Sequence, residues 1–260
     1  LKEVDLIAAE DTRNSIHLLN HFDIKTPLTS YHEYNKVDKA YQLVEKMQQG
    51  TNIALITDAG TPGISDPGED LVRICYEQGI EVTSLPGAAA CITALTLSGL
   101  PTRRFSFEAF LPKEKKERAA VLEELKNDTR TLIVYEAPHH LLGTLKELQN
   151  ALGDRRLTVC RELTKLHEEV ARGTAAELRE LFAARAKEPG GVRGEIALVI
   201  DAPGEAEAAA GAEIATASAT ACAAELVAEG LRTKEVAKRL TVEFGIPRND
   251  AYNLAMQAAR

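Results

Sequence analysis

A loop rich in glycine and proline, directly after a strand-like segment, is the part of the sequence best suited to hold a ligand. Residues 56–68 read ITDAGTPGISDPG and contain the acids Asp58 and Asp66. Such a loop either reverses the chain or brings bare main-chain amides up to a ligand, with Asp58 available to a cation or to hydroxyl groups. It has neither the Gly-Lys-Ser/Thr of a P-loop nor the GxGxxG of dinucleotide-binding proteins. Because it is too long for a simple turn, we interpret it as a binding loop.

Two other strand-like segments end in residues that could complete the same site. PGAAA (86–90) is either a close helix–strand contact that needs small side chains or the second wall of a crevice. YEAPHH (135–140) ends another segment, and its two histidines lack partners of the metal-binding type, so we expect no metal there.

Polar residues near the start of the chain are candidates for chemistry on a substrate. AAEDTRNS (8–15) contains Glu10, Asp11 and Arg13, although Asp11 could equally cap a helix and Arg13 could pair with an acid. SYHEYN (30–35) contains His32 and is either functional or an ordinary surface loop.

The densest basic stretch is KEKKER (113–118), with Arg103 and Arg104 shortly before it. Such a run is by default a solvated helix face, but it is also the best candidate for contacts with phosphates. The net charge of −8 argues against a uniformly basic nucleic-acid binder and leaves room for a local basic patch.

The elements that must position these residues alternate between strand-like and helix-like segments. Strands are expected near 4–9, 52–57, 80–85, 104–112, 131–138, 157–163 and 194–201. Helices are expected near 36–49, 69–78, 88–99, 114–126, 139–151 and 174–186, with short helices after residue 225. This rhythm predicts an α/β fold of two lobes, the first with a mainly parallel sheet and the second with a mixed sheet.

The same pattern predicts four parts. These are an α/β domain (1–101), a second α/β domain (102–201), an Ala/Glu/Gly-rich linker, partly helical or disordered (202–224), and a helix-turn-helix-like module (225–260).

Composition narrows the class of protein. Hydrophobic residues at 45% and charged residues at 27% are ordinary for a globular chain of 260 residues. No apolar run approaches the roughly 20 residues that a membrane helix needs, and the four cysteines form no CxxC pair, so we expect a reduced, cytoplasmic setting. The chain opens at Leu1 without a methionine, and we expect residues upstream.

Several motifs, taken together and in order, resemble one family closely. AAEDTR, DAGTPGISDPG, LPGAAA, AFLPKEKKER, TLIVYEAPHH and CRELTKLHEEV are similar to those of the ribosomal RNA small-subunit methyltransferase I family. This family of 16S rRNA cytidine 2′-O-methyltransferases belongs to the tetrapyrrole methylase superfamily of S-adenosyl-L-methionine enzymes. The resemblance spans about residues 1–201 and is weaker over the tail.

The resemblance implies a homodimer whose cofactor, S-adenosyl-L-methionine, lies in the cleft between two α/β domains. The residues that would line this cleft are Asp58, Ala59, Gly60, Thr61, Pro62, Pro86, Gly87, Ala88, Tyr135 and Glu136, and GEIALVI (194–200) resembles a strand that helps to hold the adenosine. It also implies an upstream strand and Gly-rich loop that would complete the cleft, so that the first domain lacks its first strand here.

The implied reaction is methylation of a cytidine ribose in small-subunit ribosomal RNA. Glu10, Asp11, Arg13 and His32 are the candidates for the substrate side, and the general base stays open among them. The RNA-binding candidates are Arg103, Arg104, Lys113, Lys115, Lys116 and Arg118. Two alternatives are a precorrin-type C-methyltransferase, which would have little use for KEKKER, and a ligand-sensing DNA-binding regulator, for which the tail is insufficiently basic.

Overall fold

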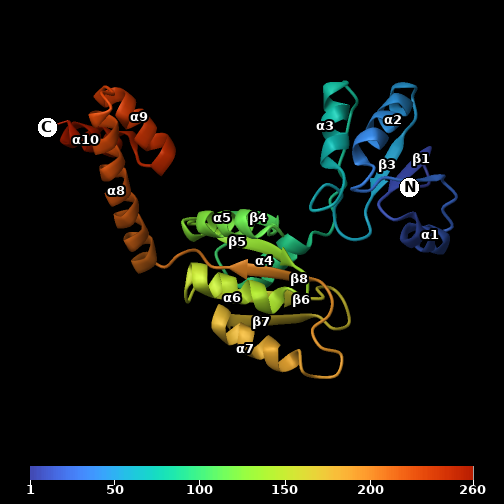
Figure 1. The fold of residues 1–260 in the computed structure, drawn as a ribbon. Coiled ribbons are helices and arrows are strands. Elements are labelled where there is room, and N and C mark those ends of the chain that lie inside the picture. The colour runs from blue at the N-terminus through green and yellow to red at the C-terminus, as the bar shows by residue number, and fades with distance from the viewer. Residues whose placement is uncertain (260) are drawn as a thin grey trace.

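The structure is a computed structural model of the whole chain. It describes residues 1–259, except for the side chains at positions 205, 206, 208, 210–212, 214 and 215. Two α/β lobes and a helical tail follow one another along the chain, as predicted (Figure 1).

The first lobe is built on a three-stranded parallel sheet in the order β2-β1-β3. The strands are β1 (Leu6–Ala9), β2 (Leu28–Ser30) and β3 (Ile53–Ile56), and the helices are α1 (Thr12–His21), α2 (Lys36–Gln48) and α3 (Glu69–Glu77). Apolar side chains of α2 and α3, such as Leu43 and Ile74, are buried against the sheet. Because all three strands are parallel, Glu10, Tyr31 and Thr57 follow them at the same edge.

One predicted strand of this lobe does not form. Residues 80–85 (IEVTSL) are extended but belong to neither sheet, and Val82 and Leu85 are exposed. The segment has strand propensity, but a strand also needs a neighbour to pair with, and residues 80–85 pair with neither edge strand of this sheet, β2 or β3. The short strand β2 was not predicted, since three residues give too little periodicity to recognise.

The second lobe carries a five-stranded mixed sheet in the order β4-β5-β8-β6-β7. Its elements are β4 (Phe105–Phe110), α5 (Lys115–Lys126), β5 (Thr131–Glu136), α6 (Leu141–Leu152), β6 (Arg156–Arg161), β7 (Glu169–Thr174), α7 (Ala175–Arg185) and β8 (Ile196–Ile200). β4 and β5 are parallel, whereas β8 is antiparallel to both β5 and β6. β7 was missed because its sequence EVARGT has no apolar alternation.

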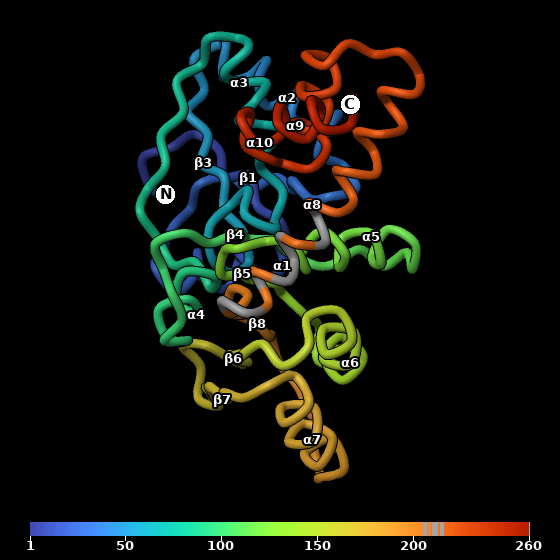
Figure 2. Tube along the Cα trace, turned by 90° about the vertical axis from the view of Figure 1, so that its left-hand side faces the viewer, coloured from blue at the N-terminus to red at the C-terminus, as the bar shows by residue number. Residues whose placement is uncertain are grey.

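Helices cover both faces of this sheet. α4 (Ala90–Ser98) packs on one face, and α5, α6 and α7 cover the other (Figure 2). The side chains of β5 alternate accordingly, because Leu132 and Val134 point into the α5–α7 core whereas Ile133 packs with α4. α4 therefore belongs by packing to the second sheet, although it precedes residue 101, the predicted domain boundary.

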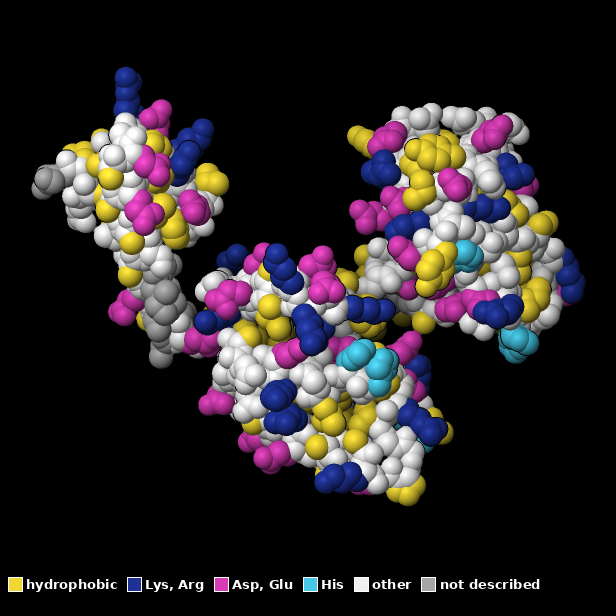
Figure 3. Space-filling view, in the orientation of Figure 1, with side chains coloured by type: hydrophobic (Ala, Val, Ile, Leu, Met, Phe, Trp, Pro, Cys, Tyr) yellow, Lys and Arg dark blue, Asp and Glu magenta, His cyan; other side chains and the backbone are white. Residues whose placement is uncertain are grey.

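The tail forms a helical module of its own. It comprises α8 (Glu205–Ala228), α9 (Thr233–Phe244) and α10 (Arg248–Ala258), whose small core includes Val236, Leu240 and Ala251. Most of the expected linker, 202–224, falls within α8, so the backbone there is helical. The module stands apart from the first lobe (Figures 1 and 3).

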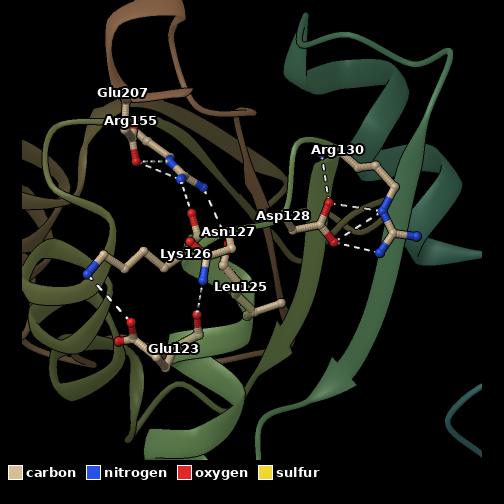
Figure 4. Close-up of polar contacts among 8 residues, drawn as sticks. All are labelled: Glu123, Leu125, Lys126, Asn127, Asp128, Arg130, Arg155 and Glu207. Atoms are coloured by element: carbon tan, nitrogen blue, oxygen red, sulfur yellow. Dashed lines mark hydrogen bonds and ion pairs between the residues drawn. The ribbon is translucent and has the colours of Figure 1, made fainter. Parts of the chain in front are cut away.

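A buried arginine joins the base of α8 to the second lobe (Figure 4). The guanidinium of Arg155 donates from Nη2 to Glu207 Oε1 at 2.6 Å and to the carbonyl oxygen of Lys126 at 2.6 Å. Its side chain is 1% exposed, so the carboxylate and the carbonyl groups at the end of α5 compensate a charge that is almost fully removed from water.

Candidate functional site

A cavity of about 480 Å³ lies where the strands of the two lobes end. Its size is within the range of roughly 300–1,000 Å³ typical of small-molecule and cofactor sites. The residues that line it are Glu10, Asp58, Ala59, Gly60, Thr61, Ile64, Ser65, Asp66, Ala89, Ala90, Phe110, Tyr135, Glu136, Ala137, Pro138, Cys160, Leu163, Gly194, Glu195, Ile196 and Ala197.

Strand register explains why distant parts of the second lobe meet in this cavity. Phe110 at the end of β4 pairs with Tyr135, and Ile196 at the start of β8 pairs with Glu136 on one side and with Arg161 on the other. The carboxyl ends of β4, β5 and β6 and the amino end of β8 therefore lie at the same level of the sheet. These four strand ends form one wall of the cavity.

The first lobe supplies an acidic wall. Glu10 follows β1, and its Oε2 accepts hydrogen bonds from Thr57 Oγ1 at 2.5 Å and from the Asp58 amide at 3.2 Å, both just after β3. Asp58 in turn accepts a hydrogen bond from Asn14 Nδ2 at 2.7 Å. These contacts fix the first residues of the glycine-rich loop at the strand ends.

The glycine-rich loop is a closely packed structure and more than a chain reversal. Gly60 has a φ of +79°, and a Cβ built on Gly68 would lie 2.8 Å from the amide nitrogen of Gly63, so side chains are disfavoured at both positions. Thr61 Oγ1 donates to the carbonyl oxygen of Ala88 at 2.9 Å, which joins this loop to the PGAAA segment.

Six of the ten predicted cofactor residues line the cavity: Asp58, Ala59, Gly60, Thr61, Tyr135 and Glu136. Pro62, Pro86, Gly87 and Ala88 do not, and Ala89 and Ala90 from the start of α4 contribute instead. Within the PGAAA segment, the residues at the cavity are therefore the last two, next to the start of α4 at Ala90, and not the first three.

The charge of the cavity comes from carboxylates. Burial raises the pKa of Asp66, and the negative charges of Glu10 and Asp58 raise it further. Burial likewise raises the pKa of the Cys160 thiol to about 11, so this cavity residue stays protonated at neutral pH. Carboxylates that lie close together in a half-closed site favour a ligand that brings positive charge, because such a ligand relieves their mutual repulsion.

The aromatic wall is held in place by Tyr135. Its ring packs edge-on against Phe107 and Phe110, with centroid distances of 4.9 and 5.7 Å. Its phenolic oxygen accepts a hydrogen bond from the Cys91 amide at 2.9 Å, and burial raises the pKa of the phenol.

The four predicted catalytic residues separate into two groups. Glu10 lines the cavity, whereas Asp11, Arg13 and His32 do not. Asp11 is the N-cap of α1 and accepts from Arg13 Nη2 at 2.6 Å, which lowers the pKa of Asp11 to about 2. His32 follows β2, and its Nδ1 is buried without a hydrogen-bond partner among the described atoms.

Five of the six predicted RNA-binding residues are exposed: Arg103, Arg104, Lys113, Lys115 and Lys116. Basic and acidic side chains are interspersed over this part of the surface (Figure 3). Arg118 differs, because it turns inward and its side chain is 16% exposed.

Several lining residues were not among the predicted site residues. Ile64, Ser65 and Asp66 lie within the glycine-rich loop itself, so extending the prediction to the end of that loop would have found them. Phe110 comes from β4, Cys160 from β6 and Leu163 from the segment just after β6, and their position depends on strand register, which the sequence does not reveal.

The residues present fit S-adenosylmethionine by their chemistry. Carboxylates of Glu10, Asp58 and Asp66 suit a sulfonium, an ammonium group and ribose hydroxyls, and the apolar surfaces of Ile64 and Phe110 suit an adenine ring. Among the described residues, no group of His, Cys, Asp and Glu is arranged to hold a metal ion. No helix in the described part of the chain is long and apolar enough to span a membrane.

Comparisons with known proteins identify the family of the chain. The family described as Tetrapyrrole (Corrin/Porphyrin) Methylases matches residues 1–179. The solved structure of diphthine synthase superimposes with a TM-score of 0.59 at 14% identity, covering 77% of this chain and 80% of that one. A cobalt precorrin-4 methyltransferase superimposes with a TM-score of 0.55 at 15% identity, covering 77% and 85%. These two likenesses concern the fold.

Relatives with much higher identity exist. Ribosomal RNA small subunit methyltransferase I of Halalkalibacterium halodurans is 44% identical over 257 residues, covering 99% of this chain and 87% of that protein. The protein of the same name from Synechocystis is 45% identical over 264 residues, covering 99% and 90%.

The chain therefore belongs to the tetrapyrrole methylase family, whose methyl donor is S-adenosylmethionine. Within it, the chain falls in the group of ribosomal RNA small subunit methyltransferases I, as the sequence motifs predicted. It is a methyltransferase.

Proposed function

We propose that the chain transfers a methyl group from S-adenosylmethionine to the ribose 2′-oxygen of a cytidine in small-subunit ribosomal RNA. The observation that carries this proposal is the acidic and aromatic cavity at the strand ends of a chain 44% identical to a ribosomal RNA small subunit methyltransferase I. A precorrin-type activity and a DNA-binding regulator are less well supported, because relatives at this identity carry the ribosomal RNA name.

When bound, S-adenosylmethionine supplies a methyl group that is already activated on a sulfonium. The task of the protein is then alignment, which in well-oriented systems contributes on the order of 7 kcal/mol or more. We assign this task to the glycine-rich loop and to Tyr135, since the Thr61–Ala88 and Tyr135–Cys91 hydrogen bonds make both rigid. Ile64, Phe110 and Leu163 give the cavity apolar surface that a bound cofactor would cover.

The ribose hydroxyl must lose a proton as the new bond forms. Of the four candidates, Glu10 is the carboxylate inside the cavity, and the Thr57 hydroxyl and the Asp58 amide hold it in position. We propose that Glu10 takes part at the reacting centre. Asp11, Arg13 and His32 then belong to the surrounding RNA-binding surface.

The proposal also covers the partners of the protein. Exposed cations at Lys113, Lys115 and Lys116, shortly after the cavity residue Phe110, would contact RNA phosphates near the cavity. Arg103 and Arg104 precede β4 at its other end and would contact phosphates farther from the cavity. A ribosomal substrate implies a cytoplasmic location. We also propose that the protein forms a homodimer and that its domains and linker meet at residues 101, 201 and 224. Light scattering on the purified chain tests the dimer.

The decisive experiment is transfer of labelled methyl groups to isolated small ribosomal subunits. We expect label in small-subunit RNA and none in large subunits or in uroporphyrinogen III. Because a 2′-O-methyl group prevents alkaline cleavage at its 3′ side, an alkaline ladder should lack one band at a cytidine. Label on a base, or on the tetrapyrrole, would contradict the proposal.

A further inference from the structure

Arg118 lies outside the cofactor cavity but reaches towards its wall. It is in the first turn of α5, two residues after the exposed Lys116, and yet its own side chain is 16% exposed. Of its donors, Nε reaches Glu147 Oε2 at 2.6 Å and Nη1 reaches the Pro112 carbonyl oxygen at 3.4 Å. One guanidinium thus contacts both α6 and the segment that precedes α5.

The remaining contacts of Arg118 lead to the cavity. Nη2 donates to Thr144 Oγ1 at 2.6 Å and lies 3.5 Å from Glu136 Oε2. The Thr144 hydroxyl, which accepts from Arg118, donates in turn to Glu136 Oε2. Glu136 lines the cavity, and its Oε1 accepts from the Ala137 amide at 2.8 Å.

Because Glu136 and Thr144 are buried, their contacts with Arg118 matter for the position of the cavity wall. Glu136 and Thr144 are 6% and 1% exposed, so a carboxylate without a cation beside it would be costly. Ala137 and Pro138 follow Glu136 directly and also line the cavity. A displaced Glu136 would therefore move three consecutive residues of the wall.

We propose that Arg118 is a positioning residue for the cofactor: through Thr144 and Glu136 it holds wall residues 136–138 in their binding arrangement. The inference rests on the proposed function, because the cavity must be the site for S-adenosylmethionine. It replaces the expectation that Arg118 contacts RNA.

The test is the affinity for S-adenosylhomocysteine, measured by titration calorimetry on the full chain without RNA. We expect Arg118→Ala to weaken binding by about tenfold or more, by analogy with the loss seen when a residue that orients a metal ligand is removed. Arg130→Ala is the matched control, since Arg130 makes a similar ion pair with Asp128 outside the cavity, and binding should change less than twofold.

A pair of variants at Thr144 separates positioning from general stability. Thr144→Ser keeps the hydroxyl relay and should bind within twofold of the wild type, whereas Thr144→Val should lose about as much affinity as Arg118→Ala. Wild-type affinity in Arg118→Ala, or equal losses in the serine and valine variants, would overturn the inference. A wild-type chain that does not bind S-adenosylhomocysteine would overturn the proposed function as well.

Discussion

The phenolic oxygen of Tyr135 accepts a hydrogen bond from the main-chain amide of Cys91 at 2.9 Å. Cys91 is the second residue of α4, and the first amides of a helix have no partner within the helix. A side chain at the end of β5 thus caps a helix from a segment 44 residues earlier in the chain, and the contact lies at the cavity.

Tyr135→Phe should therefore destabilise the protein and weaken cofactor binding together. The Cys91 amide would lose its acceptor, which costs about 1–3 kcal/mol for a buried group. Urea denaturation measures the free energy of unfolding, and calorimetry with S-adenosylhomocysteine measures the binding affinity. Tyr76→Phe is the control because Tyr76 is 85% exposed, and no change is expected there. A Tyr135→Phe protein as stable as the wild type would show that the bond contributes little.

Gly194→Ala should disturb the opposite lip of the cavity. Gly194 has a φ of +93°, and an added Cβ would lie 2.3 Å from Glu162 Cδ. An alanine in the left-handed conformation alone costs roughly 1–2 kcal/mol. We expect the free energy of unfolding to fall by more than this amount, and cofactor binding to weaken. Gly50→Ala separates the two effects, since Gly50 has the same φ of +93° but no atom within 4 Å of the added Cβ. Equal unfolding midpoints for the two variants would rule out the steric part.

Individual helices and strands could be predicted from the sequence, whereas contacts between distant segments could not. The strand Thr131–Glu136 could be predicted because it is a short, continuous apolar run rich in β-formers. The amphipathic helix Lys36–Gln48 could be predicted because its apolar residues recur at spacings of three and four. The meeting of Phe110, Tyr135 and Ile196 depends on ladder register between segments far apart, which no local pattern encodes.

Two differences between the sequence pattern and the structure have a physical cause that local patterns cannot show. IEVTSL (80–85) has the composition of a strand, but in the structure it has no ladder partner. Arg118 belongs by composition to the basic run KEKKER, but its place in the first turn of α5 directs it towards Glu136 and Glu147. Helical phase, rather than local charge, separates it from Lys115 and Lys116.

Asp66→Asn should stabilise the protein while it weakens binding of the cationic cofactor. Burial raises the pKa of Asp66 above its ordinary 3.8, so the wild type loses stability as pH rises from 3.8 through the raised value. Asparagine carries no such cost, and the stability difference in its favour should grow with pH. Affinity for S-adenosylmethionine should fall by about tenfold, equivalent to roughly 1.4 kcal/mol, and that for uncharged-sulfur S-adenosylhomocysteine by less.

Urea unfolding from pH 3 to 8 and calorimetry with both compounds measure these effects. Asp154→Asn, at an exposed position, is the control and should leave the affinities unchanged. If Asp66→Asn weakened binding of the two compounds equally, the carboxylate would not respond to the charge on sulfur.

Substitutions at the substrate side should separate the reacting centre from its surroundings. Glu10→Gln should lower kcat for methyl transfer by about a hundredfold, the lower range for loss of a general base. Asp11→Ala and His32→Ala should act mainly on KM for small subunits, since neither residue lines the cavity. Near-normal turnover in Glu10→Gln would remove it from the reacting centre, and near-normal kinetics in the other two would remove them from the substrate side.

Charge reversal at Lys113, Lys115 and Lys116 should weaken RNA binding and leave cofactor binding intact. The three ammonium groups are exposed, and phosphate contacts release counterions, so the salt dependence of RNA affinity should become shallower in the variant. Lys126→Glu, at the opposite end of the same helix, is the matched control because Lys126 is likewise exposed and already pairs with Glu123. Filter binding to small subunits over a range of salt concentrations measures the effect. An unchanged affinity at physiological salt would place the RNA-binding surface elsewhere, whereas a loss shared by Lys126→Glu would indicate a general effect of charge rather than a local contact.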